Sequence, residues 1–415
     1  MVGDEPDDDR RHPPRARSTV ITWIGSVPVL LMGALGVLAP GAVIALAWRQ
    51  RGLAVLLLAA PLTLAVTAVM TVLAPVVGLR WSELPVLALT AVLAVAGLVL
   101  RRRPGRHSGP DGSESRGRAA LGWVVGGIGG AAALAALTFR LGIGRPDAVS
   151  QSYDAVFHLN ALRYITETGS ASPLDLNGMI GRSGGFYPSL WHACAVLLVP
   201  LTGGEVPVAA NLTALLIAGL LWPLSCVFLV RQLLNPPAVL LAAAAVLSMA
   251  FVGFPWFTLS WGVLWPQTLG IALIPAVLAC ALSALGVARE DVLGGPVMGV
   301  LALGAAAVAC AAAHPGAVIS AFLLASVLAL ATALDRVQRW WRRGRLLALG
   351  QLAGTVVALA VVWWLLFTTP GIRNTTTNWA ATTTVTRAVL RHLVGAPNGT
   401  APAYLVSALV LVGAP

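Results

Sequence analysis

The stretch GLAVLLLAAPLTLAVTAVMTVLAPVVG, residues Gly52–Gly78, decides the fold class because it contains no charged side chain. An apolar run of roughly 17–25 residues spans a bilayer as a helix. Only helices and closed barrels satisfy their backbone inside lipid, and a continuous run of this length indicates a helix. Comparable runs lie at Val20–Ala47, Leu84–Leu100, Ala119–Leu141, Pro207–Val230, Pro236–Gly253, Val263–Val287, Val292–Ala312, Gly316–Leu334 and Leu346–Phe367, with a last apolar piece from Ala403.

The composition of the whole chain agrees with this interpretation. Of 415 residues, 58% are hydrophobic and 10% are charged, which excludes a soluble domain. The net charge of +11 comes from arginine without any lysine, a bias typical of high-GC bacteria, and the arginines lie in short loops. That distribution indicates membrane topology and no nucleic-acid partner. The expected fold is all-α, a polytopic transmembrane bundle of about 10–11 spans with short helices in a long outer loop.

Basic connections predict which end of the bundle faces the cytoplasm. They lie at Trp48–Arg51, Arg101–Arg118 and Asp335–Arg345, and Arg231 and Arg289 mark two more. All of them fall on one side if the segment Tyr187–Leu201 forms a re-entrant or interfacial helix. The alternative is that this segment crosses and one later span does not. With the first solution, the outer side receives Gly142–Phe186, Phe254–Trp265, Thr368–Pro402 and the four histidines His158, His192, His314 and His392.

These boundaries divide the chain into five parts. Residues 1–19 are expected to be a disordered polar tail. Residues 20–141 form a four-span bundle, and residues 142–206 form the outer loop with juxtamembrane or re-entrant helices. Residues 207–367 form a six-span bundle, followed at 368–415 by another outer loop and the start of a last span.

The decapeptide QSYDAVFHLN, residues Gln151–Asn160, is the strongest candidate for chemistry in this polar loop. The pattern predicts a helix from about Tyr153 to Thr168 with Gly169 as its C-cap. On that helix Asp154 and His158 lie one turn apart. We expect this polar pair to face the space above the bundle, while an apolar stripe lies on the membrane (Phe157, Ala161 and Tyr164).

Several roles are open to these side chains. Asp154 could act as a general base, and His158 could orient the reacting hydroxyl or bind a phosphate. The two could also share a divalent cation, although two ligands alone make no site. The purely structural alternative is that Ser152 or Asp154 only caps the helix. Phosphate contacts could come from an arginine, or from a residue nearby in the predicted outer face: Arg163, Arg182, Tyr187, His192 and His314.

Aromatic residues flank the same outer region. Trp256, Trp261 and Trp265 fit an interfacial aromatic belt, and they could instead line a groove for a sugar or prenyl chain. His314 could likewise be no more than the cap of a helix end.

The region Ala119–Leu334 resembles the GT-C membrane glycosyltransferases, which carry an essential acid in a long outer loop. The similarity rests on Asp154 in QSYDAVFHLNALRYI and on Phe186–His192, FYPSLWH, which is similar to a Tyr-Pro-Pro-Leu-type segment. Two departures are that Ala155 replaces a second acid and Ser189 replaces a proline. More narrowly, the pattern with His314-Pro315 looks like a high-GC bacterial membrane protein family of unassigned function.

The resemblance implies an enzyme of the plasma membrane that takes a sugar from a polyprenyl-phosphate carrier and transfers it to a cell-envelope glycan. Asp154 would take the proton of the acceptor hydroxyl, and a histidine or arginine would hold the departing phosphate. A lipid flippase or transporter is the alternative, although the spans Pro207–Val230, Val263–Val287 and Leu346–Phe367 lack ionisable groups. A non-catalytic partner in envelope assembly is a third interpretation.

Overall fold

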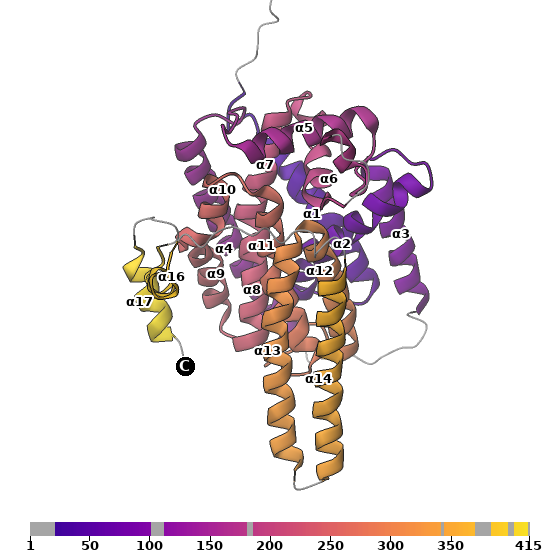
Figure 1. Cartoon of the computed structure of the whole chain (residues 1–415), viewed down its shortest axis with the longest axis vertical. Helices are drawn as coiled ribbons and strands as arrows, with labels where there is room; N and C mark the ends of the chain where they lie inside the picture. Colours follow the sequence, from indigo (N-terminus) through magenta and orange to yellow (C-terminus); the bar gives the residue numbers. More distant parts are fainter. Residues whose placement is uncertain are drawn as a thin grey trace, which may run out of the picture.

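A computed structural model describes residues 21–100, 112–180, 186–341, 344–369, 383–396 and 402–413. Within these ranges the chain is helical and has no strand, which confirms the all-α prediction (Figure 1). The predicted tail at 1–19 and most of the basic loop after Leu100 lie outside them.

Among the described residues, nine helical segments are long and apolar enough to cross a membrane, and a bent pair at Ala238–Ala250 and Val252–Ser260 would make ten. The chain is therefore a multi-pass membrane protein. The spans are α1 (Val27–Ala47), α2 (Leu53–Val76), α3 (Glu83–Leu100), α4 (Gly112–Ile143), α7 (Val206–Leu216) continued through a π-turn by α8 (Trp222–Leu234), α9 (Ala238–Leu247) with its bent partner, α11 (Trp265–Ala284), α12 (Pro296–Ala313), α13 (Pro315–Trp340) and α14 (Arg345–Thr368).

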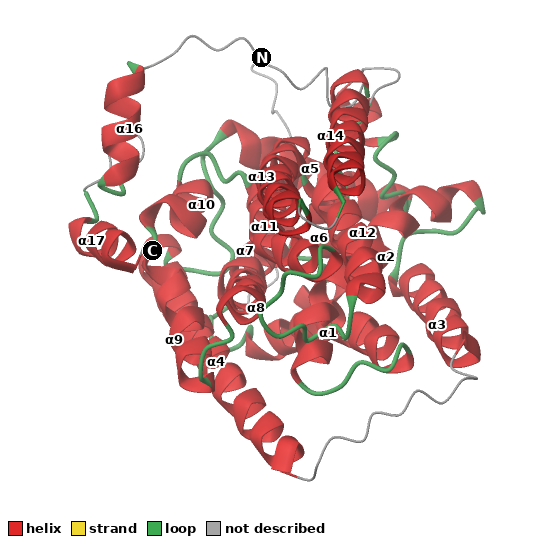
Figure 2. Ribbon diagram, turned by 90° about the horizontal axis from the view of Figure 1, so that it is seen from below, coloured by secondary structure: helices red, strands yellow, loops and turns green. Residues whose placement is uncertain are grey.

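Three spans form the centre of the bundle. In α2 and in α11, 72% of the apolar 18-residue stretch is buried inside the protein, and in Val206–Leu234 the buried share is 67%. The other spans surround them, and α14 is at the extreme, with 6% buried and α13 as its neighbour. Seen from below, α13 and α14 stand nearly end-on beside this core (Figure 2).

Short helices cover one end of the bundle, which we call the α5 end (Figure 1). They are α5 (Tyr153–Thr168), α6 (Leu190–Val196) and α10 (Thr258–Ser260). At roughly 10 Å, α6 is too short to cross a hydrocarbon core of about 30 Å. It packs instead against α2, α5, α7 and α11, consistent with the prediction that Tyr187–Leu201 does not cross.

The basic connections gather at the opposite end, which we call the basic end. Gln50 donates to the carbonyl of Leu293, and Arg231 pairs with Glu290 at 3.1 Å. Arg336 donates to the carbonyl of Leu285. These contacts bring the basic connections together around the loop between α11 and α12, at the end of the bundle away from α5, as the charge pattern predicts.

The C-terminal helices α16 (Val385–Leu393) and α17 (Tyr404–Gly413) lie beside the bundle in Figure 1. The apolar piece predicted from Ala403 is the ten-residue helix α17. The four cysteines are free thiols, and Cys280 and Cys310 are buried, as expected for small apolar side chains in spans.

Candidate active site at the α5 end

Local signals define α5, and its predicted bounds are confirmed. The Ser152 hydroxyl accepts a hydrogen bond from the Ala155 amide at 3.3 Å, so Ser152 is the N-cap. Gly169 ends the helix with φ +72°, a conformation that favours glycine, and its amide donates to the carbonyl of Ile165. Asp154 therefore lies in the first turn, where the helix dipole favours a negative charge.

The expectation that Asp154 and His158 both face the space above the bundle is wrong for His158. Its side chain is buried with 4% exposure. Ala161, which was expected on the membrane, is also buried. Asp154 is exposed. The two residues share a helix face, but α6 and the start of α11 cover that face from His158 onward. One turn of helix therefore separates an exposed carboxylate from an imidazole in the core.

His158 pairs with His192 of α6. The His158 Nδ1 and His192 Nε2 atoms are 2.9 Å apart, so one ring donates and the other accepts. Burial lowers the pKa of His158 to about 3, and burial with the neighbouring ring lowers the pKa of His192. Both imidazoles are neutral at pH 7, so neither provides a positive charge for the phosphate that the sequence analysis considered as their ligand.

Two tryptophans enclose this pair. Trp191 stacks on Trp265 with ring centroids 4.8 Å apart and an angle of 14° between the planes. His158 contacts both indoles, at 5.6 and 5.7 Å between centroids. The aromatic-belt interpretation is wrong for Trp265, which is 3% exposed and belongs to this core cluster. Stacked rings of this size hold α5, α6 and α11 in a fixed relation.

Asp154 lies against the turn that precedes α11. The Ser152 hydroxyl donates to the carbonyl of Gly262 at 3.0 Å, which ties the start of α5 to that turn. A Cβ atom on Gly262 would lie 3.4 Å from Asp154 Oδ2. Burial, with the charge of Asp154, raises the pKa of Tyr187. The Tyr187 hydroxyl therefore stays protonated and can donate a hydrogen bond, and its ring packs on Phe157 of α5 with centroids 4.6 Å apart.

The other predicted site residues are not all brought to this place. Arg163 is exposed, lies half a turn around α5 from Asp154, and pairs with Glu167 at 2.5 Å. Arg182 lies outside the described residues. His314 caps α13 by accepting a hydrogen bond from the Gly316 amide at 3.1 Å, which is the structural role considered for it in the sequence. It contacts α11 near Gly270, about 7 Å along the helix axis from Trp265.

His392 was expected on the same side of the membrane as the other histidines. It is exposed on α16, and its ring lies 2.8 Å from the carbonyl of Ala388 in the same helix. It belongs to no described cluster at the α5 end.

Sequence reasoning missed the short turn between α2 and α3. Arg80 donates to the carbonyl of Glu167 at 3.3 Å, and Trp81 donates from Nε1 to the carbonyl of Ala193 at 3.0 Å. The sequence signal for this contact was Arg80 itself, because it is a basic residue in a turn that the positive-inside rule places on the outer side. Arg80 contacts the C-terminal end of α5, roughly 20 Å from Asp154 along the helix. A phosphate held there could not be the leaving group of a displacement at Asp154.

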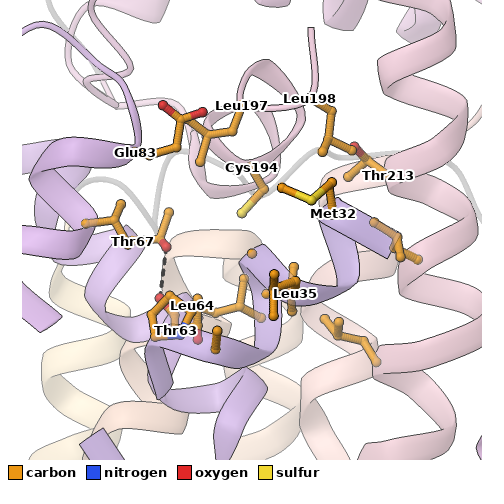
Figure 3. Close-up of a pocket in the computed structure, with 18 of the residues that line it drawn as sticks. Met32, Leu35, Thr63, Leu64, Thr67, Glu83, Cys194, Leu197, Leu198 and Thr213 are labelled. Carbon is orange, nitrogen blue, oxygen red and sulfur yellow. Dashed lines mark hydrogen bonds between the residues drawn. The ribbon is translucent and has the colours of Figure 1, made fainter. Parts of the chain in front are cut away.

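An apolar cavity of about 530 Å³ lies between α1, α2, α3, α6 and α7 (Figure 3). Cys194 of α6 and Leu197, the residue after α6, line its upper part in that view, and Glu83 lies near the same level. Met32, Leu35 and Leu87 line it and are about half exposed, so it opens toward the side of the bundle where lipid would lie. Its size is within the range of small-molecule sites.

The helix α6 connects the cavity to the aromatic cluster. Its His192 belongs to the pair described above, and two residues later Cys194 lines the cavity. Tyr187, just before α6, packs its ring on Phe157 of α5 and near that of His192. No three His, Cys, Asp or Glu side chains among the described residues come together as a metal site.

Comparison with known proteins gives a family and no activity. No curated protein and no solved structure matches the chain. One family model matches residues 34–414. These residues include the elements of the site and the cavity lining apart from Met32 and Gly33. The chain belongs to the family of unknown function DUF6541.

Proposed function

We propose that the chain is a glycosyltransferase of the plasma membrane, which moves a sugar from a polyprenyl-phosphate carrier to an envelope glycan on the outer face. The observation that carries the proposal is an exposed carboxylate, Asp154, against the Gly262 turn, on a helix whose Phe157 packs on Tyr187. The apolar cavity on the far side of α6 supports it, because a lipid-linked substrate needs a place for its chain.

The reaction is a displacement at the anomeric carbon of the donor sugar. Asp154 takes the proton of the acceptor hydroxyl, whose oxygen forms the new glycosidic bond. The bond from the anomeric carbon to the phosphate oxygen breaks, and its electron pair leaves with polyprenyl phosphate. Tyr187 donates a hydrogen bond to that phosphate as its charge develops. Positioning supplies much of the catalysis because the leaving group is already good.

The histidine pair has a supporting role in this scheme. His158 and His192 are neutral and bonded to each other, so they neither abstract the proton nor bind the phosphate. They hold α5, which carries Asp154, against α6. A divalent cation, if the donor brings one on its phosphate, would meet the same carboxylate.

A chromosomal deletion complemented with Asp154→Asn tests the proposal. Asparagine keeps the size of the side chain and cannot take a proton, so we expect insertion without function. Mass spectrometry of the strain should show one lipid-linked sugar accumulating and one envelope glycan lost. Glu167→Gln, at the other end of α5, is the matched control and should restore the wild-type profile.

A lipid flippase or an assembly partner makes the opposite prediction. In either case Asp154→Asn would complement the deletion, because neither activity needs a base at this position. Accumulation of the lipid-linked sugar on the inner leaflet of the deletion strain, reversed by Asp154→Asn, would favour the flippase.

A further inference from the structure

Three tryptophans at or before the start of α11 have different environments. Trp265 is buried against the histidine pair, and Trp256 donates from Nε1 to the carbonyl of Met249 at 2.8 Å. Trp261 is 52% exposed. Its ring is nearly parallel to that of Phe257, with centroids 5.9 Å apart and 13° between the planes. One face of the indole is therefore supported, and the other is available to a ligand.

The backbone next to Trp261 is held in an unusual conformation. Gly262 has φ +79° and Val263 has φ +52°, and the second value is rare for a β-branched residue. Such conformations persist where surrounding contacts impose them, often at functional sites. Here the Leu264 amide donates to the carbonyl of Thr258 at 2.9 Å, and Ser152 holds the carbonyl of Gly262. The turn directs Trp265 into the core and leaves Trp261 at the surface.

The same turn places Trp261 one residue from the backbone position that packs against the candidate base. Gly262, the neighbour of Trp261, is the residue whose added Cβ would lie 3.4 Å from Asp154 Oδ2. An exposed aromatic face on the same turn as a carboxylate contact suits a pyranose ring. The C–H groups on one face of the sugar pack on the electron-rich indole, and its hydroxyl groups donate to the carboxylate oxygens.

We infer that Trp261 and Asp154 form a saccharide-binding subsite, with the sugar ring stacked on the indole and a hydroxyl hydrogen-bonded to the carboxylate. The inference rests on the proposed function and adds the side chain that recognises the sugar. The other explanation for an exposed tryptophan in this region is a contact with lipid headgroups.

Saturation-transfer NMR on the full chain in nanodiscs tests the subsite. The probes are a set of methyl pyranosides of glucose, galactose and mannose. At least one should receive saturation at its ring C–H protons from the wild type. Trp261→Ala should weaken its binding by about tenfold, whereas Trp261→Phe should retain most of it. Trp364→Ala is the matched control, since Trp364 is 63% exposed on α14, a span without an acidic residue.

Two results would overturn the subsite. One is that no glycoside receives saturation from the wild type. The other is that Trp261→Ala binds as the wild type does, which would leave the indole as a lipid contact.

The subsite and the transferase can fail separately. If Asp154→Asn abolishes the envelope glycan while Trp261→Ala affects neither binding nor product, the transferase stands and the subsite is wrong. If Trp261→Ala loses the glycoside while Asp154→Asn complements the deletion, the chain binds a sugar and does not transfer it.

Discussion

At the residue scale, burial gives two neighbouring polar side chains opposite roles. Asp154 and His158 share one helix face, and only the histidine is covered. The spacing along α5 was visible in the sequence. The depth of His158 was not, because it depends on Trp191 and Trp265, which arrive from distant parts of the chain. Local patterns specify direction around a helix, whereas burial is set by tertiary contacts.

The buried pair predicts how stability depends on pH. His158 has a pKa of about 3 when folded and near 6.5 when unfolded, so the unfolded chain binds the proton more readily. Stability should be constant above pH 6.5 and fall as the pH drops toward 3, by up to about 1.4 kcal/mol per pH unit from this residue. Thermal denaturation in detergent measures it.

The matched variant for this experiment is His158→Asn. It removes one titrating group and keeps a hydrogen bond to His192, so its profile should be flatter below pH 6.5. Parallel profiles for the two proteins would show that His158 is not a buried neutral group.

Ser152 makes two contacts that a single substitution would remove. Ser152→Ala loses the N-cap of α5 and the hydrogen bond to Gly262, so we expect a loss of about 1–2 kcal/mol in stability. Activity should fall further than stability explains, because Asp154 loses its tie to the turn. Thr166→Ala removes a hydroxyl bonded only within α5 and should change little. Equal effects of the two variants on melting temperature would argue against the cap.

At the element scale, helix ends with strong local signals were predictable and helix contacts were not. Ser152 and Gly169 specify both ends of α5 through capping and a positive φ. The contact of α4 with α9 had no signal that separates one glycine of the run around Gly127 from the next. Only the structure shows which glycine faces the neighbouring helix.

This contact gives a prediction with an adjacent control. A Cβ on Gly127 would lie 2.5 Å from the Cα of Ala242, whereas nothing is within 4 Å of a Cβ on Gly126. Gly127→Ala should destabilise the bundle by about 3 kcal/mol, because backbone atoms cannot yield as a side chain can. Gly126→Ala should be neutral or slightly stabilising. Similar melting temperatures for both would show that α4 and α9 pack differently.

At the scale of the whole molecule, hydropathy and charge predicted the spans and the two ends of the bundle. This works because the bilayer imposes length and charge rules on each segment separately. The cluster of His158, Trp191 and Trp265 and the cavity could not be predicted, because both form only where helices distant in sequence meet. The same limitation explains why Arg163 was a candidate and Arg80 was not.

The orientation in the membrane can be measured by cysteine labelling. In a background without native cysteines, Glu167→Cys at the α5 end should react with a membrane-impermeant maleimide in intact cells. Arg339→Cys at the basic end should react only after permeabilisation. Both side chains are exposed, so accessibility of the residue itself is not limiting. The reverse pattern would place Asp154 in the cytoplasm and exclude an outer-face transferase.

The most direct test of the central claim uses the lipid that the deletion strain accumulates. That extract is incubated with membranes containing wild-type protein, Asp154→Asn or Glu167→Gln, and polyprenyl phosphate is measured by mass spectrometry. We predict that wild type and Glu167→Gln release polyprenyl phosphate and that Asp154→Asn, inserted in equal amount, releases none. Release by Asp154→Asn at the wild-type rate would contradict the assignment of Asp154 as the catalytic base.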